Sequence, residues 1–318
     1  MTKQKLAFNW ASSCGGCEIA IFELGTGLVE LTKKAEIVFW PAIMDYKYQD
    51  LEAMPEANID VAFMNGAIQN SENEHIAKLL RAKSKILVAF GACAYIGGIP
   101  ALANTTSRDE IFANSYKETP TTVNPEKILP ETKVQTKEGE LTIPEFYNTV
   151  KTLDQVVDVD YYVPGCPPVG EQVSKVITQL TEGPLPPKGS VIGASDRSLC
   201  YDCKRVRDER KIGKIVRTYQ TIPDPQKCML EQGIICMGPA TRGGCGSPCL
   251  DANMPCRGCY GPLPKAIDQG AKMLSALSSI FDAQTEDDIQ KIADGVADPI
   301  GTFYRFSMGR SLMRRTKR

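Results

Sequence analysis

The stretch KLAFNWASSCGGCE, residues 5–18, determines how the rest of the chain is interpreted. Residues 5–10 are a short apolar run that predicts a first β-strand, and apolar side chains from Ile21 to Leu31 then recur at helical spacing. The segment CGGCE, residues 14–18, therefore lies where the first strand passes into the first helix. Open α/β sheets place their chemistry at the carboxyl ends of strands, and two thiols at this spacing can bind one metal centre.

The motif alone leaves several kinds of site open. A Cys-x-x-Cys segment after a first strand is also typical of a thioredoxin-like redox pair or of half a zinc site. The chain has 12 cysteines and one histidine, His75, which we interpret as a surface residue of a helix over residues 71–81. Because cytosolic thiols are kept reduced, metal binding explains the cysteines better than disulfides do. With so little imidazole, any metal centre is thiolate-rich, which favours iron–sulfur clusters or structural zinc.

The size and charge of the chain limit its class. Its 318 residues are enough for two domains, and a net charge of -1 argues against nucleic acid or another polyanion as a partner. No segment has the roughly 20 apolar residues of a membrane helix. The N-terminus also lacks the pattern of an export signal. We therefore expect no membrane span and a cytoplasmic location.

Strands and helices alternate up to about residue 183. The expected strands are residues 5–10, 35–40, 59–64, 85–90 and 161–163, and the last amphipathic helix ends near residue 183. This order predicts an α/β fold, a flavodoxin-like doubly wound parallel sheet, as a first domain over residues 1–183. Residues 100–156 interrupt the pattern and are interpreted as a surface insertion with a hairpin turn at residues 137–139.

A second, smaller domain is expected over residues 184–318, after a proline-rich linker. It is loop-rich and offers little apolar sequence for a core, so we expect its folding to depend on bound metal. Its C-terminal helices include a stretch over residues 267–281 that is expected to pack back on the first domain. The basic tail, residues 305–318, is interpreted as solvated.

Each cysteine of the first domain follows a predicted strand. Because the carboxyl ends of parallel strands share one edge, these thiols can converge although they are far apart in sequence. They lie in turns rather than in apolar runs, which argues against the alternative that they are buried small hydrophobes. Four thiolates are what a cubane 4Fe-4S cluster needs. This set, called the Cys14 group, is Cys14, Cys17, Cys93 and Cys166.

Eight further cysteines make two more sites of four by sequence order. Their spacing does not match the bacterial ferredoxin run, and two zinc ribbons are an alternative. Three clusters in one chain would form an electron relay. The Cys200 group is Cys200, Cys203, Cys228 and Cys236, and the Cys245 group is Cys245, Cys249, Cys256 and Cys259.

The sequence contains no catalytic residues of its own that we can identify. It has no nucleotide or phosphate loop and no pairing of a nucleophile with a base. Substrate chemistry is therefore expected on a partner that faces the Cys14 group. Glu18 begins the helix beside this group, and we interpret it as a carboxylate favoured by the helix dipole.

On these motifs the chain resembles the small subunit of nickel–iron hydrogenases over nearly its whole length. The segments CGGCE (residues 14–18), GACA (91–94) and PGCPP (164–168) are similar to the three that hold the proximal 4Fe-4S cluster in that family. The relay subunit of respiratory complex I resembles the first domain only. By the same resemblance, Cys203, Cys228 and Cys236 correspond to distal-cluster ligands, and Cys245, Cys256 and Cys259 to medial-cluster ligands.

Two departures from the exported members refine the resemblance. Cys200 stands where their distal site has a histidine, and Cys249 lies near the place of a proline in their medial site. A fourth thiol at each site implies three 4Fe-4S clusters. The chain is most similar to cytoplasmic enzymes of methanogen type, and its length and insertion resemble the methyl-viologen-reducing branch, whose small subunit passes electrons to heterodisulfide reductase.

The resemblance implies an electron-transfer subunit of an oxidoreductase. Dihydrogen would be oxidised at a nickel–iron site on a large subunit, and electrons would pass the Cys14, Cys245 and Cys200 groups in that order. The expected partners are the large subunit, a further iron–sulfur subunit and heterodisulfide reductase. The alternatives are the small subunit of the deazaflavin-reducing branch, a dihydrogen-sensing regulatory hydrogenase, a relay in a nickel-free complex, and a zinc-stabilised scaffold.

Overall fold

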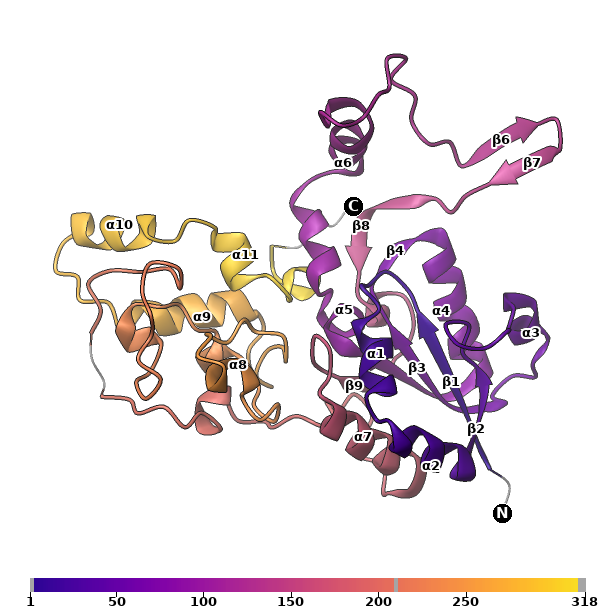
Figure 1. Ribbon diagram of the computed structural model, residues 1–318, viewed down its shortest axis with the longest axis horizontal. Coiled ribbons are helices and arrows are strands. Elements are labelled where there is room, and N and C mark those ends of the chain that lie inside the picture. Colours follow the sequence, from indigo (N-terminus) through magenta and orange to yellow (C-terminus); the bar gives the residue numbers. More distant parts are fainter. Residues whose placement is uncertain (1–2, 209–210, 314–318) are drawn as a thin grey trace.

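A five-stranded parallel sheet forms the centre of the first part of the chain (Figure 1). The computed structural model describes residues 3–208 and 211–313. The strand order β2-β1-β3-β5-β9 is that of a doubly wound sheet of flavodoxin type, which confirms the predicted fold class. The strands are β1 (Gln4–Trp10), β2 (Ala35–Phe39), β3 (Ile59–Asn65), β5 (Ser84–Phe90) and β9 (Tyr161–Val163).

Helices cover both faces of this sheet because alternate strand residues point to opposite sides. Val61 and Phe63 of β3 pack with α1 (Gly16–Phe22) and α7 (Gly170–Glu182). Ala62 and Met64 of the same strand pack with α4 (Ser71–Lys83), and α3 (Tyr48–Ala53) lies on that side too. The short α5 (Gly91–Ile96) follows β5 directly and is buried throughout.

The helix expected from Glu18 onward is two helices. α1 ends at Phe22, and α2 (Thr26–Lys34) begins after Gly25, whose φ of +55° lies in the left-handed region. A helix cannot continue through that conformation, so the apolar spacing spans a turn that periodicity alone does not reveal.

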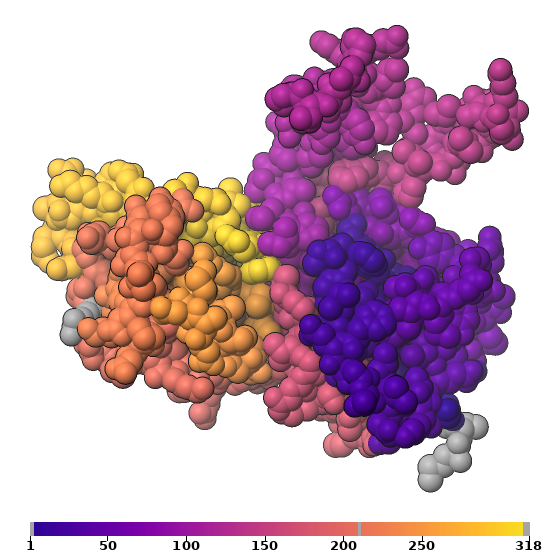
Figure 2. Space-filling model, in the orientation of Figure 1, coloured from indigo at the N-terminus to yellow at the C-terminus, as the bar shows by residue number. Residues whose placement is uncertain are grey.

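The insertion is partly anchored and partly projecting. Its ends pack against the sheet through η1 (Ile99–Thr105), η3 (Leu153–Gln155) and the antiparallel pair of β4 (Ile68–Asn70) with β8 (Phe146–Lys151). Asn104 holds the two ends together, since its side chain pairs with both backbone groups of Val150. Between them lie α6 (Arg108–Ala113), η2 (Asn114–Glu118) and the predicted hairpin of β6 (Lys133–Thr136) and β7 (Gly139–Thr142), which extend away from the body (Figures 1 and 2).

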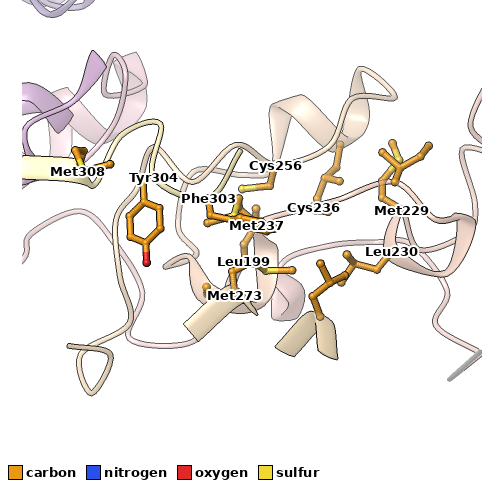
Figure 3. Packing of buried hydrophobic residues seen from close by; sticks show 14 of the residues in the cluster. Leu199, Met229, Leu230, Cys236, Met237, Cys256, Met273, Phe303, Tyr304 and Met308 are labelled. Carbon is orange, nitrogen blue, oxygen red and sulfur yellow. The ribbon is translucent and has the colours of Figure 1, made fainter. Parts of the chain in front are cut away.

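The second part of the chain is built of loops and short helices around its own core (Figure 3). Leu199, Met237, Met273 and Phe303 are buried there, so this part has more apolar packing than we expected. Its helices are η4 (Leu199–Tyr201), η5 (Leu230–Gln232), η6 (Gly238–Ala240), α8 (Pro248–Asp251), α9 (Gln269–Ser278), α10 (Glu286–Asp294), α11 (Pro299–Phe303) and η7 (Met308–Arg310).

The segment after α11, rather than α9, packs back on the first part of the chain. α9 contacts η6, and Gln269 at its start bonds to the carbonyl of Gly258. Gly309 in η7 lies so close to Gly97 that a Cβ atom on Gly97 would come within 2.8 Å of its Cα. Arg310 forms an ion pair with Asp154 at 2.8 Å.

The interpretation of a solvated basic tail is therefore wrong for residues 305–311, whereas Leu312 and Met313 are exposed and residues 314–318 lie outside the described part. Within residues 3–208 and 211–313, no helix is both long and apolar enough to cross a membrane.

Candidate metal centres

The structure brings the Cys14 group together at the carboxyl edge of the sheet. Cys14 and Cys17 follow β1, Cys93 lies in α5 after β5, and Cys166 follows β9. Cys17 and Cys93 are both 7% exposed, whereas Cys14 and Cys166 are exposed. The group therefore forms a site that is buried on the protein side and open on the other.

Glycines make room for the sulfur atoms of this group. Gly91 has a φ of +85°, and a Cβ atom there would lie 2.3 Å from the Sγ of Cys17. Gly98 has a φ of +55°, and its Cβ atom would lie 2.5 Å from the Sγ of Cys93. Both positions thus require glycine for backbone conformation and for close approach. Gly91 belongs to the segment GACA that the sequence analysis named, but neither its role nor that of Gly98 was predicted from the sequence.

The thiols of this group disfavour one another's ionisation. Burial, followed by the nearby Cys93 and Cys166, raises the pKa of Cys17 well above its usual value. Burial and the nearby Cys166 and Cys14 raise the pKa of Cys93 to about 12. Thiols that oppose one another's ionisation in this way are deprotonated together when a cation supplies the compensating charge.

The four cysteines of the Cys200 group line one cavity with Leu199, Leu230 and two arginines, Arg205 and Arg207. A Cβ atom on Gly238 would lie 3.3 Å from the Sγ of Cys200 and 3.6 Å from that of Cys236, so glycine again leaves room beside two sulfurs. Burial raises the pKa of Cys236 to about 12, and the nearby Cys200 and Cys228 act in the same direction.

The Cys245 group has one member, Cys249, in α8 and the other three in the loops on either side of that helix. Burial raises the pKa of Cys245, with a further contribution from Cys249. Burial and the nearby Cys166, Cys245 and Cys249 raise the pKa of Cys259 to about 12. Burial raises the pKa of Cys256 well above its usual value, and the nearby Cys236 of the Cys200 group and Cys259 of its own group act in the same direction.

Two contacts join the three groups into a row. The backbone of Cys166 forms a hydrogen bond with the thiol of Cys259, which connects the Cys14 group to the Cys245 group. The backbone of Cys256 bonds to the thiol of Cys236, which connects the Cys245 group to the Cys200 group, and both residues lie beside Met237 (Figure 3). The Cys245 group thus lies between the other two.

Glu18 lies in the first turn of α1, as predicted, but its burial and its partners were not foreseen. It is 3% exposed and accepts hydrogen bonds from the Nε1 of Trp40 and from the Nδ2 of Asn65, the latter at 2.5 Å. Burial raises the pKa of Glu18, although both hydrogen bonds act in the opposite direction. The carboxylate ties α1 to the ends of β2 and β3 behind the Cys14 group, and helix position alone did not reveal this role.

The donor chemistry of the three groups fits iron–sulfur clusters. Each group consists of four thiols without a histidine or carboxylate among them, and thiolates are the usual ligands of 4Fe-4S clusters. In the described part of the chain, no three Cys, His, Asp or Glu side chains are placed to bind a single metal ion. The fit therefore rests on the thiol sets and not on a preformed single-ion site.

Comparisons with known proteins agree with this donor set. Residues 14–180 match the family described as "NADH ubiquinone oxidoreductase, 20 Kd subunit". The chain is 44% identical over 283 residues to the iron–sulfur subunit of the F420-non-reducing hydrogenase of Archaeoglobus profundus, a match that covers 87% of this chain and 88% of that protein. It is 36% identical over 316 residues to the corresponding F420-non-reducing hydrogenase subunit of Methanothermobacter marburgensis, covering 98% of this chain and 96% of that protein.

A solved structure supports the same relationship. The structure is that of a NAD⁺-reducing [NiFe]-hydrogenase in the H₂-reduced state. One of its chains is similar with a TM-score of 0.50 and 28% identity, over 58% of this chain and 94% of that chain. The chain therefore belongs to the family of nickel–iron hydrogenase small subunits, together with its relatives from the F420-non-reducing hydrogenases.

Proposed function

We propose that this chain conducts electrons between a nickel–iron site on a large subunit and an acceptor, with one 4Fe-4S cluster at each of its three cysteine groups. Membership of the family makes the chain a hydrogenase subunit whose catalytic site is on the large subunit and whose cofactors are iron–sulfur clusters. A 4Fe-4S cluster held by thiolates supplies reversible one-electron transfer. The observation that carries the proposal is the row of groups, in which Cys166 contacts Cys259 and Cys256 contacts Cys236.

The cysteines fit the role of a rigid cage. Backbone hydrogen bonds reach the thiols of Cys93, Cys228 and Cys236, from Ile99, Glu231 and Gly238 among others. Such bonds hold a sulfur in place and limit rearrangement when charge arrives. The two units that we propose, residues 1–183 and 184–318, would then hold the first cluster and the other two respectively.

The large subunit would cover the open side of the Cys14 group. Large apolar side chains are exposed here, including Trp10 at 50%, Ile19 at 55% and Ile43 at 43%. A Cβ atom on Gly15 of the cysteine loop would lie 3.0 Å from the ring of Trp10, and Ile43 is in the turn that follows Trp40. Exposed apolar groups beside a site mark surfaces for protein association.

The acceptor would dock near the Cys200 group at the other end of the row. We propose a further iron–sulfur subunit there, leading to heterodisulfide reductase, in a cytoplasmic complex. The resemblance to the methyl-viologen-reducing branch supports this acceptor, and relatives named F420-non-reducing favour it over the deazaflavin-reducing alternative, since F420 is a deazaflavin.

Nickel and iron per chain, measured in the complex that copurifies anaerobically with this protein, test the proposal. We expect one nickel and about thirteen irons, from three 4Fe-4S clusters and one active-site iron. About twelve irons without nickel would support a relay fed by another donor. Zinc without iron would refute the relay and leave a zinc-stabilised scaffold.

A substitution in the first group separates electron transfer from catalysis. Replacing Cys17→Ala should abolish dihydrogen-dependent dye reduction, because electrons can no longer leave through the Cys14 group. Hydrogen–deuterium exchange at the large subunit should persist. Equal loss of both activities would show that the substitution disrupts the complex instead.

A further inference from the structure

Arg205 is a buried arginine in the wall of the Cys200 cavity. Its side chain is 8% exposed, and the residue lines the cavity with all four cysteines of the group. Its Nη1 donates to the carbonyls of Asp224 and Lys227 at 2.7 and 3.0 Å. Its Nη2 donates to the carbonyl of Leu250 at 3.0 Å and to the Oδ1 of Asn253 at 2.7 Å. These acceptors are all neutral oxygens.

Among the described residues, one N–H donor of this guanidinium has no acceptor and its positive charge has no carboxylate partner. Arginine has five N–H donors, and the fifth, on Nε, is buried without an acceptor among the described residues. No carboxylate in the described part of the chain forms an ion pair with Arg205. A buried donor without an acceptor and a buried charge without a partner are both costly, so they indicate a missing group of opposite character. The cavity that Arg205 lines is where such a group would lie.

We propose that Arg205 is a positioning residue for an anionic cluster at the Cys200 group, to which its Nε–H donates a hydrogen bond at sulfur. This inference rests on the proposed function, because the acceptor would be the thiolate-bound cluster. Four thiolates give such a cluster a net negative charge, which the guanidinium compensates. A fixed positive charge favours the more negative, reduced state, so Arg205 raises the reduction potential at this end of the relay.

A second arginine at the same cavity provides an internal comparison. Arg207 also lines the cavity. Burial raises the pKa of Cys200, and the positive charge of Arg207 acts in the opposite direction. Arg207 is exposed, so water and salt screen its charge. Arg242 is as deeply buried as Arg205, at 7% exposed, but it pairs with Asp196 and does not line the cavity. Comparing the three arginines therefore tests whether a buried position and a place in the cavity wall are both needed for an effect on the cluster.

The test is a redox titration of the purified hydrogenase complex, followed by electron paramagnetic resonance. The signal that changes in a Cys200→Ser variant identifies the cluster of the Cys200 group. Arg205→Met, which removes the charge and the donor, should shift the one-electron equilibrium at least tenfold toward the oxidised state, a fall of about 59 mV. Arg205→Lys, which keeps the charge, should shift it less. Arg207→Met and Arg242→Met should each change it by less than threefold.

Iron content distinguishes the possible failures. Full iron with native potentials in both Arg205 variants would overturn the role of Arg205 and leave the relay standing. Absence of iron from the Cys200 group in the native complex would overturn the relay itself, and this inference with it. If the Arg205 variants lose iron, their potentials cannot be compared, and the structure of the native complex then identifies the acceptor of the Nε–H of Arg205. Nε within hydrogen-bonding distance of a cluster sulfur supports the inference, and a different acceptor overturns it.

Discussion

Gly91 carries two constraints at a single residue. Its φ of +85° disfavours any side chain, and a Cβ atom would lie 2.3 Å from the Sγ of Cys17. We expect Gly91→Ala to displace this ligand and to lower the iron content by about four per chain, the content of one cubane cluster. Gly139→Ala is the matched control, because Gly139 also has a positive φ, +135°, but nothing lies within 4 Å of its Cβ position. Iron content and paramagnetic resonance spectra that are native in both variants would contradict the placement of a cluster at the Cys14 group.

Single residues also show where sequence reasoning reached its limit at the site. The strand-end rule predicted that Cys14, Cys93 and Cys166 converge, and the structure places them together. The rule concerns backbone topology, so it could not reveal Arg205, whose role depends on which loops fold over it. The rule also could not predict the burial of Glu18, which depends on Trp40, directly after β2, and on Asn65, the last residue of β3.

Asp160 shows how one carboxylate aligns several elements. Its Oδ2 accepts from the backbone N–H of Leu87 in β5 at 2.9 Å and from Arg81 of α4 at 2.6 Å, and its Oδ1 accepts from Lys188 at 2.6 Å. Burial would raise the pKa of Asp160, but the hydrogen bonds from Lys188 and Arg81 outweigh it and lower the pKa. The ionised form is therefore the one that stabilises the edge between β5 and β9.

We expect Asp160→Asn to lower the free energy of unfolding by about 2 kcal/mol, since a hydrogen bond to a charged group contributes about 1.5–3 kcal/mol. Because the native pKa is lowered, the carboxylate stabilises the fold above the unfolded-state pKa of about 3.9 and ceases to do so as the pH falls through the native pKa. The difference in thermal stability should be equal at pH 7 and pH 5 and should narrow below about pH 3.9. Lys188→Met is the control, with an expected cost below about 1 kcal/mol, because Lys188 is 77% exposed. An equal loss in both variants would contradict this account.

Some of the helices and strands could be predicted from the sequence, and others could not. Each of the five expected strands lies within one residue of the observed one, because each is an apolar run bounded by polar or turn residues. The pairing of β4 with β8 was not predicted, since it joins Ile68 to Lys151 across a long insertion and depends on tertiary contacts. The break between α1 and α2 was missed because Leu24 and Leu28 keep helical spacing across Gly25.

In the molecule as a whole, the projecting part of the insertion extends away from the body (Figure 2). Both strands of its hairpin are largely exposed, and the facing pair Val134 and Leu141 is 45% and 61% exposed. An isolated two-stranded hairpin is only marginally stable, and exposed loop tips are preferred sites of proteolysis.

We expect brief trypsin treatment of the purified complex to cut first within residues 119–145, at Lys127, Lys133 or Lys137, without loss of iron. Mass spectrometry of the fragments identifies the cut. Full protection of the hairpin would contradict this expectation and show that a partner covers the segment. First cleavage in the second part of the chain would also contradict it, and would show that the cysteine loops open more readily than the hairpin.

The uneven exposure of the Cys14 group has a consequence for its reactivity. Cys17 and Cys93 are shielded by the fold, whereas Cys14 and Cys166 face outward. Outward-facing thiolates are the ones that oxidants reach first, and oxidation beyond the sulfenic acid is generally irreversible. Until another protein covers that side, the lone subunit is vulnerable to air at the end where dihydrogen-derived electrons would enter. The docking of the large subunit that we propose on this side would therefore also shield Cys14 and Cys166 from oxidants.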